Sequence, residues 1–161
     1  MFRIGILRCS DRCALGQRTD TLGSAIKEAL KDSGSVFKYE IVPDEKDSIM
    51  YILKDWCDIA ELDIIITTGG DGLGPRDWTP EATRDIIDRL CPGIPELLRW
   101  EMFKNDKTAA FSRATAGIRK KTLIINLPGS EKAVRESMRV LLPILPQAVE
   151  MLRGNAPKSC G

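Results

Sequence analysis

Two short apolar runs constrain the fold of this chain more than any other feature of its sequence. Residues 62–67 include three consecutive isoleucines and run directly into a glycine-rich segment, and residues 122–127 read Thr-Leu-Ile-Ile-Asn-Leu. Short apolar runs bounded by polar residues and glycine are typical of central strands in a parallel sheet covered by helices on both faces.

The rest of the chain alternates between strand and helix patterns. Further strands are expected at residues 2–9 and 36–42. Helices are expected over residues 22–33, 49–60, 79–91 and 95–103, and from Ser130 onwards with a break near Pro143 and Pro146, while residues 108–116 are expected to be extended around a turn. Gly34 is expected to end the first helix, and Thr79 to cap the third, with Pro80 at its first position. The sequence therefore predicts a single α/β domain over residues 1–161, with a core of about 2–152 and βαβ units forming a mostly parallel sheet.

Charge and composition exclude several classes of protein. The 161 residues carry 24 Lys and Arg against 23 Asp and Glu, a formal net charge of +1, which argues against a nucleic-acid-binding or membrane-surface protein. The apolar run before Arg8 is too short for a signal peptide, and no segment has the apolar length of a membrane span, so we expect a cytoplasmic protein. Five cysteines without a CxxC pair favour reduced thiols over disulfides or a zinc site.

The absence of histidine narrows the chemistry further. It excludes a Ser-His-Asp triad, a Cys-His protease and a histidine-ligated metal centre. Carboxylates, Lys, Arg, hydroxyls and backbone amides remain, a set suited to phosphate groups and Mg²⁺.

Ligands of open α/β sheets bind at the carboxyl ends of the strands. This rule predicts that four segments share one rim: Ser10-Asp11-Arg12, Pro43-Asp44, residues 69–77 and Pro128-Gly129.

The segment of residues 67–80, Thr-Thr-Gly-Gly-Asp-Gly-Leu-Gly-Pro-Arg-Asp-Trp-Thr-Pro, is the strongest local signal on that rim. Its glycines allow backbone N–H groups to approach an anion, and a helix that begins at Thr79 directs its positive end to the same place. It matches neither Walker A nor the GxGxxG fingerprint. The alternative is a tight strand-to-helix connection in which glycine serves only the turn.

Asp44 and Asp77 each follow a predicted strand. Two carboxylates on one rim can share a Mg²⁺ ion whose other ligands are waters and phosphate oxygens. The alternative is helix capping: Asp44 as the N-cap of the helix that carries Ile49, and Asp77 as a charge that stabilises the helix beginning at Thr79.

Two further segments offer phosphate ligands. Arg113 and Arg119 are candidate forked donors, with Ser112 adding a neutral hydrogen bond. Lys120-Lys121 is interpreted as a solvated basic turn. Residues 126–130, Asn-Leu-Pro-Gly-Ser, form either a second anion-binding turn or a helix entry.

These same segments resemble the molybdopterin adenylyltransferase family of molybdenum-cofactor biosynthesis, in family order over roughly residues 4–150. The matching motifs are Ser10-Asp11-Arg12, Pro43-Asp44-Glu45, Thr67 to Gly72 with Arg76-Asp77 and Thr79-Pro80-Glu81-Ala82-Thr83, Ser112-Arg113-Ala114 with Gly117 and Arg119, and Asn126-Leu127-Pro128-Gly129.

The resemblance implies a three-layer α/β/α domain, assembled as a homotrimer, that transfers AMP from Mg-ATP to the terminal phosphate of molybdopterin and releases pyrophosphate. It implies that Asp44 and Asp77 are the catalytic aspartates and the Mg²⁺ ligands, that Ser112 lies in the active-site pocket, and that a molybdenum insertase is a candidate partner. The residues implied to bind molybdopterin and the ATP phosphates are Ser10, Asp11, Thr68, Gly69, Gly70, Asp71, Gly72, Arg76, Ser112, Arg113, Asn126, Pro128 and Gly129.

Two residues depart from the family pattern: Asp71 stands where the family usually has Thr, and Leu22 where it has Ser. A carboxylate at position 71 repels ATP unless it faces solvent, pairs with Arg76 or recruits a cation. Our hypothesis is that Asp71 makes nucleotide binding more dependent on Mg²⁺, and an unchanged Mg²⁺ requirement in Asp71→Thr would count against it.

Three alternatives to the adenylyltransferase stay open at this point. They are the related insertion step, which is expected within a longer multidomain chain, a pterin-binding oligomer without turnover, and a generic nucleotide-binding α/β domain. A tungsten pathway is equally compatible, because adenylylation precedes metal insertion.

Overall fold

The computed structural model describes residues 2–32 and 34–155. Within these residues, six strands form one sheet in the order β2-β1-β3-β6-β5-β4. Strands β2 (Gly34–Val42), β1 (Phe2–Cys9), β3 (Ile64–Thr68) and β6 (Thr122–Leu127) are parallel, whereas β5 (Ala116–Arg119) and β4 (Arg89–Leu90) continue the sheet antiparallel. The prediction of a mostly parallel α/β sheet is confirmed.

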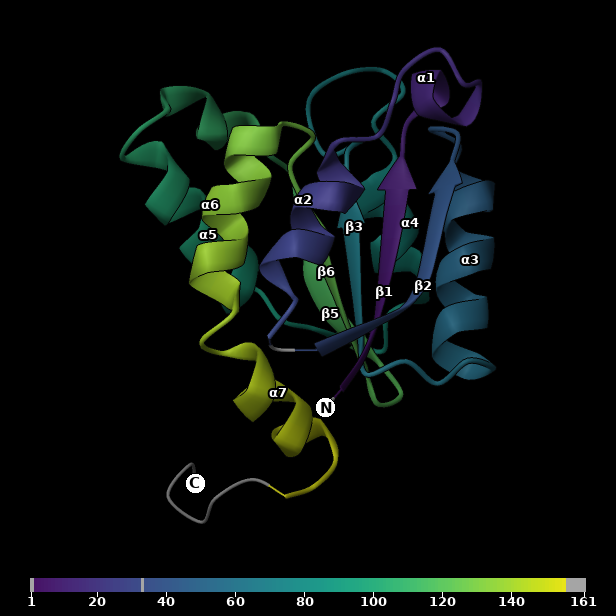
Figure 1. Cartoon of the computed structure of the whole chain (residues 1–161), viewed down its shortest axis with the longest axis vertical. Helices are drawn as coiled ribbons and strands as arrows, with labels where there is room; N and C mark the ends of the chain where they lie inside the picture. Colours follow the sequence, from purple (N-terminus) through teal and green to yellow (C-terminus); the bar gives the residue numbers. More distant parts are fainter. Residues whose placement is uncertain (1, 33, 156–161) are drawn as a thin grey trace.

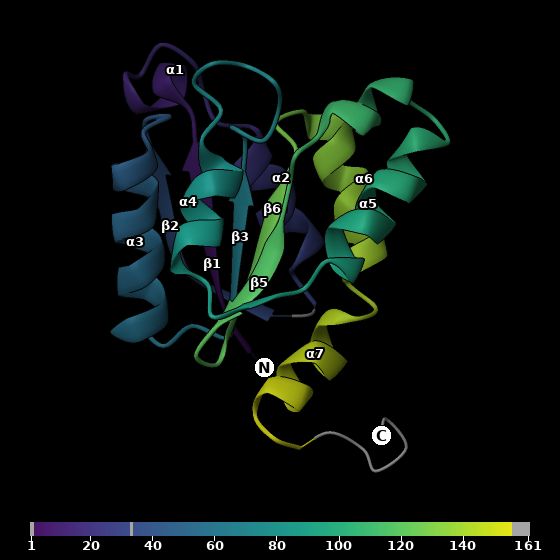
Figure 2. The same cartoon turned by 180° about the vertical axis from the view of Figure 1, so that it is seen from behind.

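Helices cover both faces of the sheet (Figures 1 and 2). Helices α2 (Leu22–Ala29), α5 (Gly93–Phe103) and α6 (Glu131–Leu141) lie on one face, and α3 (Lys46–Asp58) and α4 (Thr79–Ile86) on the other. The short helix α1 (Asp11–Ala14) lies at the carboxyl ends of the parallel strands, and α7 (Leu145–Leu152) at their opposite ends. The three-layer α/β/α arrangement is therefore as expected.

The two apolar runs form the centre of the sheet, where their side chains alternate between two cores. Ile64, Ile66 and Ile125 pack on the side of α2 and α6, whereas Ile65 and Ile124 pack with Trp56 of α3 on the other side. All of these side chains are fully buried. Burial on both faces explains why neither run alternates with polar residues.

Several boundaries differ from the predictions because tertiary pairing outweighs local pattern. Helix α2 ends at Ala29, and Gly34 begins β2 instead of ending the helix. Helix α4 ends at Ile86, well before Pro92, since the following residues pair as β4 with β5. Residues 107–111 form a 3₁₀ helix, η1, within the segment that was expected to be extended.

The start and end of the last helical segment are as predicted. Ser130 caps α6 by accepting a hydrogen bond from the Ala133 N–H (3.3 Å). The helix breaks before Pro143, and α7 begins at Leu145 with Pro146 in its first turn. Within residues 2–32 and 34–155, no helix combines the length and the apolar content that a membrane crossing requires.

Candidate active site

The carboxyl ends of β1 and β2 are joined by two aspartates. The Asp11 N–H donates to Asp44 Oδ2 (2.9 Å), and the Asp44 N–H donates in return to Asp11 Oδ1 (3.0 Å). Arg76 binds both oxygens of Asp11, at 2.7 Å and 2.9 Å, and this pairing lowers the pKa of Asp11. The first, second and third strands therefore meet at one rim, as the sequence predicts.

The glycine loop after β3 is fixed from both sides. Gly69 and Gly70 have positive φ angles of 92° and 68°. Thr79, at the first turn of α4, donates through its hydroxyl to the Gly69 carbonyl (2.8 Å) and through its N–H to the Gly70 carbonyl (3.0 Å). The Thr68 hydroxyl donates to the Pro128 carbonyl (2.8 Å). The predicted capping role of Thr79 is wrong: Trp78 precedes the helix, without a side-chain cap.

Gly69→Ala is expected to destabilise the protein by about 2 kcal/mol, because an alanine there suffers both backbone strain and a steric clash. A Cβ at this position would lie 2.3 Å from Arg8 Nη1 and 2.4 Å from the Cys9 carbonyl. Gly16→Ala is the matched control, since Gly16 also has positive φ (70°) but nothing lies within 4 Å of its Cβ position. Urea unfolding measures the stability of both variants. An equal loss of stability in the two would show that the steric clash contributes nothing.

Asp44 and Asp77 both lie against the glycine loop. Asp77 Oδ2 accepts the Gly74 N–H (2.9 Å), and a Cβ built on Gly70 would lie 3.3 Å from Asp44 Oδ1. Burial, together with the negative charges of Asp11 and Asp77, raises the pKa of Asp44. Neither carboxylate caps a helix, because Glu45 precedes α3 and neither α3 nor α4 has a side-chain cap. The capping alternative is therefore wrong for Asp44. Asp77 holds the loop, and its stabilisation of α4 through charge stays a prediction.

Arg113 reaches the same loop, but its guanidinium is engaged by protein oxygens. It donates to the carbonyls of Gly72 (2.6 Å) and Asp77 (2.7 Å) and pairs with Glu81 of α4. Its main-chain N–H donates to the Asp71 carbonyl (2.7 Å). Arg113 thus clamps residues 71–77 in place, and its predicted contact with substrate phosphate stays a prediction.

Asp71 neither faces solvent nor pairs with Arg76, two of the three arrangements expected to relieve its repulsion of ATP. The residue is 6% exposed, so it does not face solvent, and Arg76 pairs with Asp11 instead. Asp71 Oδ2 accepts the Ser112 hydroxyl (2.5 Å). Burial, chiefly, and the nearby Asp77 raise the pKa of Asp71.

Three other candidate residues, Asn126, Ser10 and Arg119, make hydrogen bonds within the protein. The Asn126 side chain is fully buried and contacts Thr67, Thr83 and the Thr115 N–H, so it supports the rim from beneath. The Ser10 hydroxyl caps α1. The predicted role of Arg119 as a phosphate donor is wrong. Arg119 pairs with Asp58 at the opposite end of the sheet, too far along β5 to meet a ligand at the rim.

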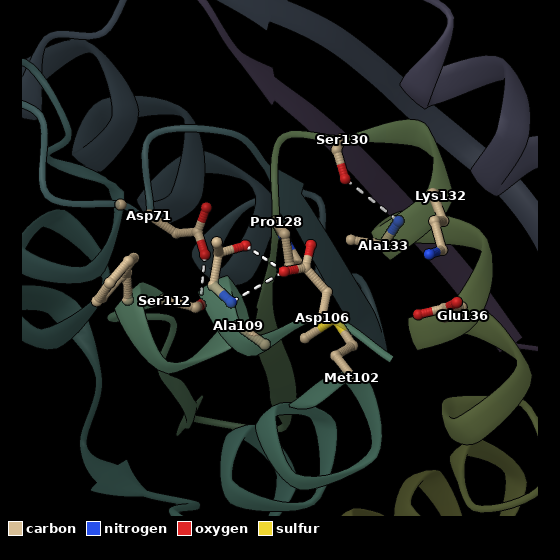
Figure 3. Close-up of a pocket in the computed structure, with 13 residues that line it drawn as sticks. Asp71, Met102, Asp106, Ala109, Ser112, Pro128, Ser130, Lys132, Ala133 and Glu136 are labelled. Atoms are coloured by element: carbon tan, nitrogen blue, oxygen red, sulfur yellow. Dashed lines mark hydrogen bonds between the residues drawn. The ribbon is translucent and has the colours of Figure 1, made fainter. Parts of the chain in front are cut away.

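Sequence reasoning missed a buried charge beneath the loop and a cavity beside it. Arg8 is 5% exposed and donates to the Thr68 carbonyl (3.0 Å); the one available signal was a basic residue inside an apolar strand. The cavity, of about 300 Å³, opens between the glycine loop, η1 and the start of α6 (Figure 3). Its walls come from segments distant in sequence, which no local pattern connects.

Comparison with known proteins identifies the family of this rim and loop. Residues 5–147 match the family described as the probable molybdopterin binding domain. The chain belongs to this family. The match includes every element that forms the rim, from β1 to the start of α6.

Relatives within the molybdopterin-binding family align over nearly the whole chain. A protein of Helicobacter pylori (strain J99) named molybdopterin adenylyltransferase is 44% identical over 155 residues, covering 94% of this chain and 88% of that protein. The structure titled molybdopterin biosynthesis enzyme MoaB from Thermus thermophilus superposes with a TM-score of 0.92 at 48% identity, covering 97% of this chain and 99% of that one. The tungsten cofactor synthesizing protein MoaB of Pyrococcus furiosus superposes with a TM-score of 0.86 at 30% identity, over 94% and 97% of the two chains.

Proposed function

We infer that this protein is a molybdopterin adenylyltransferase, which transfers AMP from ATP to the terminal phosphate of molybdopterin and releases pyrophosphate during molybdenum-cofactor biosynthesis. The observation that carries the inference is a family match over residues 5–147 together with two aspartates that converge on one glycine loop. The name of the 44% identical Helicobacter relative supports the same reaction.

The chemistry asks mainly for positioning and for charge compensation. The attacking group is a phosphate oxygen, which is already ionised at neutral pH, so no histidine is needed as a general base. The phosphorus–oxygen bond to AMP forms as the bond to pyrophosphate breaks. Helix α4 begins beside the glycine loop, where Thr79 contacts Gly69, so the positive end of its helix dipole favours negative charge on the phosphates at the rim.

The residues of the rim fit a magnesium ion. Among the described residues, Asp44 and Asp77 each use Oδ2 for a hydrogen bond and leave Oδ1 without one. Two carboxylate oxygens, completed by phosphate oxygens and water, form a donor set that Mg²⁺ prefers. When bound, the ion supplies positive charge that offsets the charge of the reacting phosphates. We propose that Asp44 and Asp77 hold it.

The wild-type protein is expected to form adenylylated molybdopterin and pyrophosphate in equal amounts from molybdopterin, ATP and Mg²⁺. The two products are measured separately, by chromatography and by a pyrophosphate assay, with and without chelation of the divalent cation. Formation of both products, lost on chelation, is the expected result. Tight binding of molybdopterin without either product would instead identify a pterin-binding protein that has the fold of an enzyme.

The homotrimer and the insertase partner that the resemblance implies stay predictions. The acidic pair supports the enzyme over a binding protein without turnover, because carriage of a phosphorylated pterin gains nothing from two carboxylates at the phosphate site.

A further inference from the structure

The cavity beside the rim has polar walls rich in hydrogen-bond acceptors. Its carboxylates are Asp71, Asp106 and Glu136, and among the described residues that line it Lys132 carries the only positive charge. Its apolar walls are Met102, Ala109, Phe111, Pro128 and Ala133. An acidic cavity with apolar walls disfavours a phosphate and suits an uncharged ring that has donors on its edge.

Two of the three hydroxyl groups in the cavity have their protons engaged by its carboxylates. Ser112 donates its proton to Asp71 Oδ2 (2.5 Å), and Thr108 donates its proton to Asp106 Oδ1 (2.7 Å). The Ser130 hydroxyl accepts the Ala133 N–H. The donors of Ser112 and Thr108 are therefore engaged within the protein, and the carboxylates remain to receive hydrogen bonds from a ligand.

Asp71 is the most buried carboxylate in this wall. Its residue is 6% exposed, whereas Asp106 is exposed and Glu136 half-buried. One of its oxygens is bound by Ser112, and the second carries no hydrogen bond to the other residues of the cavity (Figure 3). A ligand that brings N–H donors to this carboxylate gains charge-assisted hydrogen bonds, which are stronger than those between neutral groups.

The cavity connects with the aspartate rim through Gly72. Gly72 lines the cavity, and a Cβ built on it would lie 2.9 Å from Asp77 Oδ2. One molecule can therefore place a ring in the cavity and its phosphate at the rim. Both substrates have a ring and a phosphate, but their edges differ. A pterin presents an amino group and a ring N–H side by side, whereas adenine presents one amino group flanked by ring nitrogens that only accept.

We propose that Asp71 is a specificity-determining residue whose carboxylate accepts the paired N–H donors of the aminopyrimidine edge of the pterin. The pterin ring then occupies the cavity, and adenosine binds outside it. This inference rests on the proposed function, which supplies the two substrates. It assigns to Asp71 a direct contact with the acceptor substrate, in place of the Mg²⁺ dependence hypothesised from sequence alone.

The test uses two phosphate-free probes, pterin and lumazine, which differ by replacement of the 2-amino group with a carbonyl. Dissociation constants are measured by fluorescence titration for the wild type, Asp71→Asn, Asp71→Thr and the control Asp85→Asn, which alters an exposed carboxylate on α4 that pairs with Lys46. The wild type and Asp85→Asn are expected to bind pterin at least about tenfold more tightly than lumazine, as for a charge-assisted hydrogen-bonded pair. Asp71→Asn is expected to lose this preference, because its amide donates toward the lumazine carbonyl.

Three outcomes overturn the inference. They are a wild type without preference for pterin, equal weakening of both probes in the Asp71 variants, and a weakened ATP affinity in Asp71→Asn with pterin binding unchanged, which would place adenine in the cavity. Circular dichroism shows whether each variant folds, and Asp71→Thr serves as the second variant if Asp71→Asn does not fold. The turnover assay is separate: a wild type that forms product but does not discriminate the probes overturns only this inference, and one that discriminates without forming product overturns only the proposed function.

Discussion

Asp77→Asn is expected to lower adenylyl transfer by at least about 10²-fold, the scale on which removal of one group that stabilises charge in the transition state is felt. The variant removes one of the two carboxylate oxygens proposed to hold Mg²⁺. It leaves an oxygen of similar size that still accepts the Gly74 N–H, which Asp77 Oδ2 accepts at 2.9 Å. Asp44→Asn is expected to have a loss of the same order. Single-turnover formation of adenylylated molybdopterin at saturating ATP measures both.

Asp85→Asn provides the matched control for the charge change. Asp85 lies on α4 and pairs with Lys46 at a site where its side chain is 49% exposed, so its loss is expected to leave turnover within about twofold of the wild type, as for an exposed ion pair. Thermal unfolding of all three variants checks that the fold is intact. A fully active Asp77→Asn would remove Asp77 from the catalytic machinery and leave it only the loop contact with Gly74.

Asp20→Asn is expected to destabilise the protein by about 3–5 kcal/mol, the cost of leaving a buried charge without its partner. The side chains of Arg8 and Asp20 are 6% and 4% exposed and lie 3.4 Å apart. Arg8 Nε has no other partner among the described residues. Asp20 accepts the Leu22 N–H with Oδ1 (3.0 Å), and the Gly23 N–H (3.1 Å) and the Tyr39 hydroxyl with Oδ2. Asparagine keeps one acceptor oxygen, so the change removes the charge together with the hydrogen bonds made by the other oxygen. Denaturant unfolding monitored by tryptophan fluorescence measures the loss.

The double variant Arg8→Met/Asp20→Asn separates the unpaired charge from other effects. It removes the charge that Asp20→Asn leaves behind, so it is expected to be more stable than Asp20→Asn alone. The opposite order would mean that the pair contributes through packing beneath the glycine loop rather than through compensation of charge.

Much of the layered fold follows from patterns that are local in sequence. The runs at residues 62–67 and 122–127 predicted two central strands, and the structure has β3 at Ile64–Thr68 and β6 at Thr122–Leu127. These predictions succeed because burial on both faces of a strand leaves a continuous apolar run. Ser130 likewise predicted the start of α6, because a cap requires only neighbouring residues.

The predictions that failed concern contacts between distant segments. Residues 89–90 and 116–119 are too short to show a strand pattern and become β4 and β5 by pairing with each other and with β6. Arg113 and Arg119 look equivalent in sequence, yet one clamps the glycine loop and the other pairs with Asp58 at the far end of the sheet. They are separated because β5 runs antiparallel to β6 between them, from the rim to the opposite end of the sheet.

The sequence by itself determined the alternation of strands and helices and the rim at which the carboxyl ends of β1, β2, β3 and β6 gather. It also carried the family resemblance that supports the proposed reaction. Only the tertiary structure decided which side chains face a ligand. Asp44 and Asp77 lie against the glycine loop, and Asp71 lines a cavity between that loop, η1 and α6. The reason is physical: periodicity records which face of an element is buried, whereas the partner of a charged group depends on the packing of segments far apart in the chain.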